Sequence, residues 1–396
     1  MRQKVIIVGW GYTSRLFLIR SLGEAGCEVV VIVLENIKTP IFDIYSKYVS
    51  EVVRCSNKND LVNILLEQCK SSEGKPIIIP NNDMSVSIID MHHDELVEHF
   101  HIPHIHHEQG AITAWMNKDR QKALAQKLGL NIAHSLGIIH MQERRYDIPP
   151  GLTYPCFTKT REYIPGYKHT LHHCENEDEL RQGLNHLTTI VSNATILVEE
   201  YKEIEREYAV VGVSDGEHVI IPGIIEILQM SEGSGKGVAI QGKVTPVDGY
   251  EDLIERFSQF VREVGLVGLF DIDFYISGGK VYFGELNLRI GGSASAVWKL
   301  GVNLPLIMLK HFRGESIEGM QTSITKTATF VNERTGIDNW YVGYYDTKKY
   351  RQLLASDISF IKDDKDPMPW KRFKRFERFM HLKRTIKKLM PWKKSE

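Results

Sequence analysis

The chain has 396 residues, a formal net charge of −1, 42% hydrophobic residues and 25% charged residues, a composition typical of a globular protein with more than one core. Five scattered cysteines without a C-x-x-C pair argue against structural zinc and indicate a reducing compartment. The opening residues lack the apolar core of a signal peptide, and no stretch reaches about 18 apolar residues. We therefore expect a cytoplasmic protein without a membrane span.

Strand and helix signals alternate over the first hundred residues. Apolar, β-branched runs at 4–8, 27–34 and 76–80 are separated by helical patterns. This order predicts a parallel sheet with right-handed crossovers, whose strand ends carry the ligand-facing loops. Asn82 and Asp83 follow the third strand on the same edge as the first glycine turn, so we expect them near a substrate.

That first turn, VIIVGWGYTS, supports two interpretations. A strand, two glycines (Gly9 and Gly11) and a helix also begin a dinucleotide-binding unit, and Glu35 stands about where a ribose-binding acid would. Ser14 occupies the place of the third glycine, so a nicotinamide-dependent oxidoreductase is kept only as an alternative. In the other interpretation the turn contacts substrate through Gly11, Tyr12, Thr13 and Ser14.

The signals change in the middle of the chain. A helix is expected after Asn117, its N-cap, and Asp215-Gly216 is expected to form a hairpin turn. The pattern predicts a strand at 154–160, an acidic helix at 175–190, antiparallel strands across 195–228, a helix at 250–263 and a hairpin at 268–292.

The last hairpin carries a cluster of oxygen-bearing side chains. Glu285 and Asn287 are two residues apart on a strand and project from one face. Asp273 on the partner strand reaches that face only in the correct register: a two-residue Gly278-Gly279 turn would pair Asp273 with Gly284 and turn it away. We therefore predict a three-residue loop, residues 277–279.

Carboxylate and amide oxygens grouped in this way suit Mg²⁺, with Mn²⁺ as an alternative ion. A solvated hairpin face also carries alternating acids, and it would account for Asp271. It does not account for two carboxylates and an amide followed directly by Arg289 and the Gly291-Gly292 turn. The metal-binding interpretation is therefore favoured.

With these residues the chain resembles the ATP-grasp ligases, whose metal-binding strand has the form E-x-N-x-R, as in biotin carboxylase and D-alanine ligase. The resemblance covers roughly residues 1–315. It implies an α/β fold in which a Rossmann-like domain with a parallel sheet precedes two α+β lobes that clamp ATP. The expected units are 1–108 (Rossmann-like domain), 109–205 (small lobe with linker helix), 206–320 (lobe with the metal-binding hairpin) and 321–396 (extension with a basic helix).

The resemblance also implies roles for individual residues. It assigns nucleotide binding to Lys118, Lys159, Glu199, Glu200, Tyr201 and Glu207, metal binding to Asp273, Glu285 and Asn287, catalysis to Arg289 and Lys159, and substrate contacts to Gly11, Tyr12, Thr13, Ser14, Asn82, Asp83, Arg289, Gly291 and Gly292. Two cationic lysines with one or two Mg²⁺ would neutralise a triphosphate. The glycine-rich loop of the family is poorly matched, because 160–169 contains only Gly166; Arg161, Lys168 or His169 would supply contacts there.

Two other features are given smaller weight. The histidines at 92–107 and 169–173 lack a second half-site for zinc and are expected at the surface or at sheet edges. The segment 231–243 fails the spacing of a Walker motif and is read as a mobile loop that closes on substrate near Lys236 or Lys243.

The tail is a separate electrostatic object. The segment from Pro367 to Glu396 contains eleven Lys or Arg residues and two Glu residues, which gives it a net charge of +9. Apolar residues recur at helical spacing (Phe373, Phe376, Phe379/Met380, Ile386, Leu389/Met390), with Trp370 and Trp392 as flanking aromatics and Pro391 ending the helix. This pattern favours a helix on anionic lipid over one docked on its own protein, and over nucleic-acid binding. The tail also resembles D-aspartate-ligase-like members of the family.

The sequence thus predicts an ATP-dependent carboxylate–amine ligase that works through an acyl phosphate and releases ADP and phosphate. If the tail binds the cytoplasmic face of the membrane, we expect the acceptor to be a lipid-linked or cell-envelope precursor. A soluble ligase that makes a free dipeptide or similar metabolite is the alternative. Small-molecule substrates and no nucleic acid are expected as partners, and a homodimer is left open.

Overall fold

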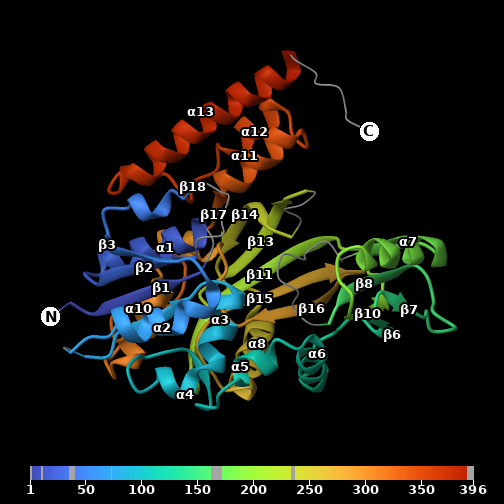
Figure 1. Ribbon diagram of the computed structural model, residues 1–396, viewed down its shortest axis with the longest axis horizontal. Helices are drawn as coiled ribbons and strands as arrows, with labels where there is room; N and C mark the ends of the chain where they lie inside the picture. Colours follow the sequence, from blue (N-terminus) through green and yellow to red (C-terminus); the bar gives the residue numbers. More distant parts are fainter. Residues whose placement is uncertain are drawn as a thin grey trace.

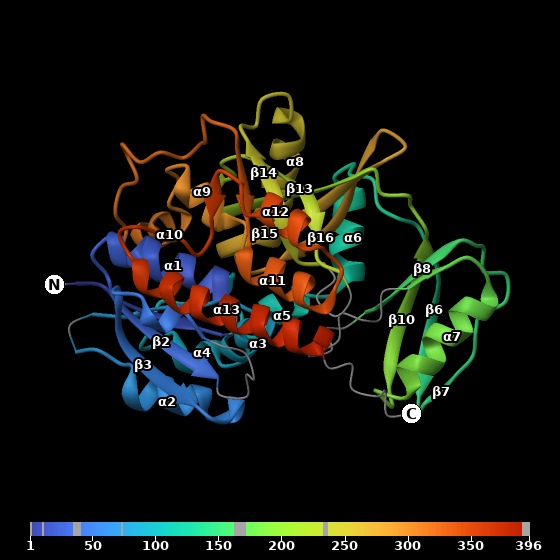
Figure 2. The same cartoon turned by 90° about the horizontal axis from the view of Figure 1, so that it is seen from above.

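The computed structural model describes residues 2–9, 12–34, 41–72, 74–161, 172–232 and 237–389 (Figure 1). Three sheets organise the described chain, and each has its own helices. The parallel sheet lies beside the largest sheet, while the five-stranded sheet and its helix extend to one side (Figure 2). The predicted mixture of parallel and antiparallel α/β structure is confirmed.

The N-terminal sheet is parallel, in the order β3-β2-β1-β4. Its strands are β1 (Lys4–Val8), β2 (Glu28–Leu34), β3 (Val49–Cys55) and β4 (Ile77–Pro80). Around it lie α1 (Tyr12–Glu24), η1 (Asp43–Tyr45), η2 (Lys58–Asp60), α2 (Leu61–Gln68), α3 (Asp83–Met91) and α4 (His93–Leu96). Continuous Val/Ile runs fill β1, β2 and β4 because both faces of these strands are buried. The edge strand β3, which is mostly exposed, was not predicted.

The second sheet has the order β7-β6-β10-β8-β9. It consists of β6 (Ser135–Gln142), β7 (Arg145–Tyr146), β8 (Cys156–Thr160), β9 (His172–Cys174) and β10 (Ala194–Glu200), and α5 (Ala111–Trp115) and α6 (Lys118–Lys127) precede it. The predicted acidic helix is α7 (Glu177–Thr188), whose Leu180, Leu184 and Leu187 pack on this sheet. One sheet face is therefore covered by a helix.

The largest sheet of the described chain has nine strands. They are β5 (His104–Ile105), β11 (Arg206–Asp215), β12 (Val219–Ile220), β13 (Ile224–Met230), β14 (Ala239–Thr245), β15 (Leu266–Ser277), β16 (Lys280–Asn287), β17 (Ala328–Val331) and β18 (Ile358–Ser359). The helices α8 (Glu251–Val264), α9 (Ala294–Lys299) and α10 (Leu304–Phe312) accompany it. The predicted turn at Asp215-Gly216 is present: the Asp215 carboxylate accepts hydrogen bonds from the amides of Glu217 and His218.

The C-terminal part forms α11 (Glu333–Val342), α12 (Thr347–Leu353) and α13 (Pro367–Leu389), with α13 crossing α11 (Figures 1 and 2). Phe373 and Met380 of α13 are buried in a cluster with Phe42 and Trp340. The ring centroids of Phe42 and Phe373 are 5.7 Å apart. The first half of the tail helix is thus docked on its own protein.

The tail's apolar side chains do not form the single stripe that the sequence predicted. Phe379, Leu382 and Ile386 are 50%, 59% and 48% exposed, whereas Phe373 is fully buried. A helix of this length carries two apolar stripes, one for the body and one facing outward. Trp392 and Pro391 lie outside the described residues. No helix of the described chain combines the length and apolarity needed to cross a membrane.

A buried ion pair joins the first helix to the start of the last. Nε of Arg20 in α1 lies 2.9 Å from Oδ2 of Asp366, the residue before α13, and both side chains are about 1% exposed. Arg20 also donates to the carbonyl oxygens of Ile361 and Asp366. Asp366 therefore anchors the start of the tail helix to α1.

Candidate active site

The hairpin β15–β16 brings the predicted metal ligands together by a different route from the one expected. Ser277 pairs with Lys280, so the turn has two residues, Gly278 and Gly279, both with positive φ. The predicted three-residue loop is therefore wrong. A β-bulge at Gly284 inserts one residue into β16 and shifts the register.

Beyond the bulge the register is the one that the metal site requires. Asp273 lies opposite Glu285, and Asp271 lies opposite Asn287. Residues directly opposite in an antiparallel pair share a sheet face, so all four side chains lie on one side. A Cβ on Gly284 would meet the Asp273 carbonyl oxygen at 2.8 Å, so glycine lets the two backbones approach at the bulge.

Asp273, Glu285 and Asn287 form the core of the candidate metal site. Nδ2 of Asn287 lies 3.1 Å from Oδ2 of Asp273, and Nζ of Lys118 lies 3.4 Å from Oε2 of Glu285. Two carboxylates and an amide oxygen form a hard donor set, which fits Mg²⁺ with substrate phosphates completing its coordination. In the described part of the chain no three His, Cys, Asp or Glu residues form a group that could hold a metal ion.

The same sheet face continues toward β11. Glu207 lies opposite Tyr275, two residues from Asp273. The pKa of Tyr275 is raised, first by burial and then by the carboxylates of Glu199 and Glu200 and by Tyr282. Tyr275 was not singled out from the sequence, although its spacing from Asp273 is a signal for this face. Glu207 thus stands in line with the metal-site residues.

Glu199 binds two lysines. Its Oε1 lies 2.5 Å from Nζ of Lys122 and 2.9 Å from Nζ of Lys159, and all three side chains are largely buried. Burial and the charge of Lys159 lower the pKa of Lys122 to about 8, although Glu199 acts in the opposite direction. Lys122 was missed by the sequence analysis; its position four residues after Lys118 on α6 places both on one helix face.

The next two residues after Glu199 are also engaged. Glu200 accepts a 3.0 Å hydrogen bond from the His134 amide and pairs with Lys202 at 3.0 Å. Burial raises the pKa of Glu200, but these hydrogen bonds and the lysine charge outweigh it and lower the pKa below its usual value. The Tyr201 ring stacks on His173 of β9, with centroids 3.9 Å apart. Glu200 and Tyr201, which are predicted to bind nucleotide, are therefore held in place by contacts at the end of β10.

Arg289 connects the hairpin with the N-terminal sheet. Its Nε lies 2.6 Å from Oδ1 of Asp83, and its Nη2 lies 3.4 Å from Oδ1 of Asn287. Burial lowers the pKa of Arg289, but Asp83, Asp271 and Glu285 outweigh burial and raise it above its usual value. Arg289 therefore stays charged beside a cluster of acids.

The remaining predicted substrate residues make contacts within and around the first glycine turn. Asn82 caps α3 by accepting from the Ser85 amide, so its side-chain oxygen has a structural task. The hydroxyl of Ser14 accepts a 3.4 Å hydrogen bond from Nδ2 of Asn81. Thr13 is buried, and a Cβ on Gly292 would lie 3.6 Å from its Oγ1. The glycine turn and the end of the hairpin are therefore neighbours.

Two glycines of this region are required by close contacts. A Cβ on Gly9, whose φ is +134°, would meet Oδ1 of Asn81 at 2.2 Å. A Cβ on Gly291 would meet Oδ2 of Asp271 at 1.7 Å. Glycine at these positions is explained by neighbouring side chains, without any need for a pyrophosphate. Gly11 and the side chain of Tyr12 lie outside the described residues.

Several other predicted contacts can be placed. Arg161 pairs with Asp119 at 2.6 Å, and Lys243 pairs with Glu226 at 2.7 Å. Gly166, Lys168, His169 and Lys236 lie outside the described residues. Of the histidines expected at the surface or at edges, His93 and His104 are instead buried, and burial with neighbouring histidines lowers the pKa of His104 to about 3. An uncharged ring is compatible with its stack on His107.

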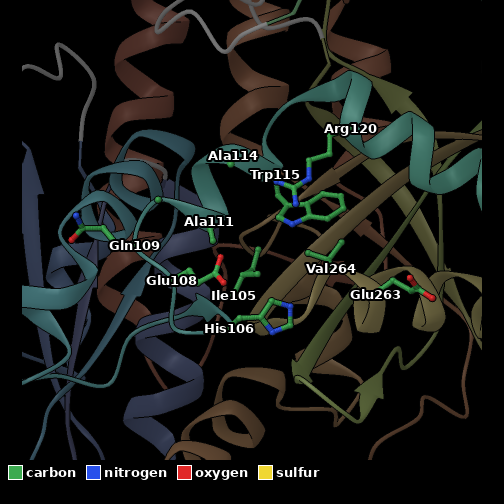
Figure 3. A pocket seen from close by; sticks show the side chains of 11 residues that line it. Ile105, His106, Glu108, Gln109, Ala111, Ala114, Trp115, Arg120, Glu263 and Val264 are labelled. Atoms are coloured by element: carbon green, nitrogen blue, oxygen red, sulfur yellow. The ribbon is translucent and has the colours of Figure 1, made fainter.

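A separate cavity of about 290 Å³ lies among α5, α6 and α8. Arg120 covers the Trp115 ring at 3.9 Å from its centroid, and Figure 3 shows the two side chains together, with Glu108, His106 and Glu263 on other parts of the wall. Arg120 is two residues from Lys118 but lies on another side of α6. None of the predicted site residues lines this cavity.

Comparison with known proteins gives consistent results. No family model matches the chain. It is 26% identical over 186 residues to the carbamoyl phosphate synthase large chain of Lachnoclostridium phytofermentans, and 23% identical over 210 residues to the C-terminal section of that enzyme from Methanocaldococcus jannaschii. These matches cover 46% and 52% of this chain but only 17% and 34% of the relatives' own length.

Solved structures cover more of the chain. The biotin carboxylase domain of Hydrogenobacter thermophilus 2-oxoglutarate carboxylase, in complex with MgADP and bicarbonate, aligns with a TM-score of 0.64 at 18% identity, over 83% of this chain and 74% of that one. N5-carboxyaminoimidazole synthetase from Staphylococcus aureus, complexed with ADP, aligns with a TM-score of 0.60 at 16% identity, over 83% and 82%. These likenesses support the predicted α/β fold with parallel and antiparallel sheets.

Proposed function

Because the chain has the ATP-grasp fold, we propose that it is an ATP-dependent ligase that joins a carboxylate to an amine. The observation that carries this proposal is the single sheet face with Asp273, Glu285 and Asn287, beside Lys118. Glu207 and Tyr275 continue that face, and Lys159 is proposed to approach the nucleotide from the five-stranded sheet. The proposed nucleotide-binding set is Lys118, Lys159, Glu199, Glu200, Tyr201 and Glu207.

A bound Mg²⁺ would be held by Asp273, Glu285 and Asn287 and would neutralise phosphate charge. Lys118, whose Nζ already faces Glu285 at 3.4 Å, is placed to turn toward a phosphate oxygen. Lys159 shares Glu199 with Lys122, so two cations are held in a largely buried position by one acid. A phosphate group beside Lys122 and Lys159 would balance the second positive charge, which Glu199 alone leaves uncompensated.

The reaction itself would proceed in two steps. The donor carboxylate attacks the terminal phosphorus of ATP, ADP leaves, and an acyl phosphate results. The amine then attacks the acyl carbon, phosphate leaves, and a proton of the amine is lost to form the amide. Arg289 offers parallel N–H groups to a substrate carboxylate, so it lowers the barrier by positioning and by charge.

The Asp83–Arg289 pair supports an amine substrate that carries its own carboxylate. Asp83 and Arg289 have side chains 25% and 20% exposed and oppositely charged groups 2.6 Å apart. An α-amino acid also presents opposite charges a few bonds apart. We propose that its ammonium group approaches Asp83 before deprotonation while Arg289 holds a carboxylate; Thr13, Ser14, Asn82, Gly291 and Gly292, with Gly11 and Tyr12, would form the surrounding wall.

The tail supports a location. Phe379, Leu382 and Ile386 form an exposed stripe on a helix rich in Lys and Arg, which is the composition of a segment that binds anionic lipid. We propose that the enzyme works at the cytoplasmic membrane surface on a lipid-linked or cell-envelope precursor. In the alternative, a soluble ligase of small-molecule metabolism, this stripe has no lipid partner. We propose that these functions are distributed over four domains, residues 1–108, 109–205, 206–320 and 321–396.

An ADP-release screen over amino acids and envelope precursors tests the proposal. Release should need both a carboxylate and an amine, and it should be lost in the combined variant Glu285→Ala and Asn287→Ala. Lys280→Gln, at the exposed turn of the same hairpin, is the matched control and should keep activity. Calorimetry with ATP–Mg²⁺ and with NADH separates the ligase from an oxidoreductase. Binding of NADH alone, or full-strength nucleotide binding by the double variant, would contradict the proposed site.

A further inference from the structure

Two cysteines face each other across the five-stranded sheet. Cys156 of β8 and Cys174 of β9 are directly opposite in an antiparallel register. They are 0% and 1% exposed, and their thiols are hydrogen-bonded to each other. Opposite residues in such a pair have Cβ atoms about 4.5 to 5.5 Å apart, close to the spacing of a disulfide.

We propose that Cys156 and Cys174 form a redox-sensitive pair, which a hydroperoxide converts into a cross-strand disulfide. The Cys156 sulfur attacks one peroxide oxygen, the O–O bond breaks, and a sulfenic acid and water form. The Cys174 sulfur then attacks the sulfenic sulfur, the S–S bond forms, and a second water leaves. Two thiols lose two electrons and two protons, and one peroxide takes them up.

The surroundings of the two thiols differ. Burial raises the pKa of both thiols, to about 12 for Cys174. The bond from Cys174 lowers the pKa of Cys156, whereas the same bond raises that of Cys174. Cys156 lies in β8, which has a partner strand on each side, so it is assigned as the attacking thiol, and Cys174 of the short strand β9 is assigned as the resolving thiol. A small hydroperoxide fits a buried pair better than a bulky disulfide reagent does.

Access to the pair comes from the position of β9. This strand has three residues, stands at the edge of its sheet and pairs only with β8 among the described strands. Short edge strands open locally more readily than central ones. Local opening of β9 moves Cys174 away and uncovers Cys156, which stays in β8 because that strand also pairs with β10. The reaction is consequently slow at neutral pH and specific to this pair.

The disulfide would fix a strand that reaches the nucleotide region. Side chains alternate along β8, so Cys156 faces the α7 side, and Phe157 and Lys159 face the other. His173 of β9 lies opposite Phe157 and stacks on Tyr201. Linking Cys174 to Cys156 therefore restrains the strand that carries His173. The effect on nucleotide binding rests on the proposed function, whereas formation of the disulfide does not.

Peptide mapping of the full-length protein tests the pair directly. The protein is treated with hydrogen peroxide, free thiols are alkylated after unfolding, and peptides are mapped without reductant. We expect a peptide linking Cys156 to Cys174, two hydrogens lighter than its reduced parts and abolished by reductant. In Cys174→Ala the link should vanish, and Cys156 should over-oxidise to the sulfinic acid. The matched control Cys69→Ala, also at a buried thiol, should form the link at an unchanged rate.

A second measurement does not depend on any variant. Hydrogen exchange of the β9 amides in the wild-type protein should slow at least tenfold after peroxide and return with reductant. Recovery of both cysteines as alkylated thiols, or links mainly among Cys27, Cys55 and Cys69, would overturn the proposal. Unchanged ATP binding together with a formed link would count only against the nucleotide consequence, so the two ideas fail separately.

Discussion

The guanidinium Nε of Arg289 lies 2.6 Å from Oδ1 of Asp83, and this contact joins the end of the metal-site hairpin to the first turn of α3. The two residues are 206 positions apart in sequence. The proposed acceptor site therefore exists only where the parallel sheet and the largest sheet meet, and a shift of either sheet would separate its charges.

Replacing Asp83 should weaken binding of the amine substrate without changing binding of the nucleotide. In Asp83→Asn, loss of a charge-assisted contact of about 1.5 to 3 kcal/mol should raise the KM for the amine roughly 10- to 100-fold. The KM for ATP should change less than about twofold, because Arg289 lies between Asp83 and the proposed metal ligands. Initial rates of ADP release with each substrate varied in turn check this. An equal rise in both KM values would refute the assignment.

The bulge at Gly284 should be essential for nucleotide binding. In Gly284→Ala the new Cβ meets the Asp273 carbonyl oxygen, and the register of Asp273 against Glu285 is disturbed. We expect ATP–Mg²⁺ affinity to fall at least about tenfold, as removal of supporting contacts at metal sites commonly does. Gly278→Asn is the control, because asparagine tolerates the left-handed turn conformation and a Cβ there meets no neighbour. Calorimetry compares the two; equal affinities would argue against the site.

The buried Lys122 should leave a signature in the pH dependence of stability. Its folded-state pKa of about 8 lies below the ordinary 10.5. Between these values the unfolded chain holds a proton that the folded chain has lost, so stability rises with pH. Relative to Lys122→Met, the wild-type free energy of unfolding should increase by about 3 kcal/mol from pH 8 to pH 10.5.

Urea unfolding of both proteins across this range measures that difference. Other groups that titrate above pH 8, including the buried thiols and tyrosines, are present in both proteins and largely cancel. A difference that stays flat with pH would show that Lys122 keeps its charge in the folded protein.

The exposed stripe of α13 should govern binding to anionic vesicles. Phe379→Ser, Leu382→Ser and Ile386→Ser together remove three apolar side chains, each worth about 1.5 to 3 kcal/mol when fully buried. Flotation with anionic phospholipid vesicles should fall at least tenfold. Met91→Ser, at a similarly exposed residue of α3, is the control and should float like the wild type.

These substitutions are a cleaner test than truncation before α13. Truncation would also remove Phe373 and Met380 from the core that they share with Phe42 and Trp340. Equal flotation of the triple variant and the wild type would exclude lipid binding through this stripe and favour the soluble ligase.

The sequence predicted which hairpin residues gather but not how. Alternation along β16 was enough to place Glu285 and Asn287 on one face, whereas the placement of Asp273 depended on the register of the hairpin. The turn length was wrong because a bulge, which depends on one close backbone contact at Gly284, restores the register at another position. Local spacing alone does not distinguish these two solutions.

What the sequence missed depends on tertiary packing. Lys122 was overlooked because its importance arises from Glu199 on another sheet. The tail was read as one apolar stripe, because helical spacing does not reveal that Phe373 and Phe379 face different surroundings. The strand β3 lacked a clear signal because most of its residues are exposed at a sheet edge.

The ion pair between Arg20 and Asp366 has a consequence for biosynthesis. Arg20 emerges from the ribosome long before Asp366, which lies 346 residues later in the sequence. At about 5 to 20 residues per second, that interval is roughly 20 to 70 s. During this time Asp366 has not yet been synthesised, so the Arg20 side chain must remain hydrated in the nascent N-terminal part of the chain. Pairing of Arg20 with Asp366 is therefore expected to be among the last events of folding.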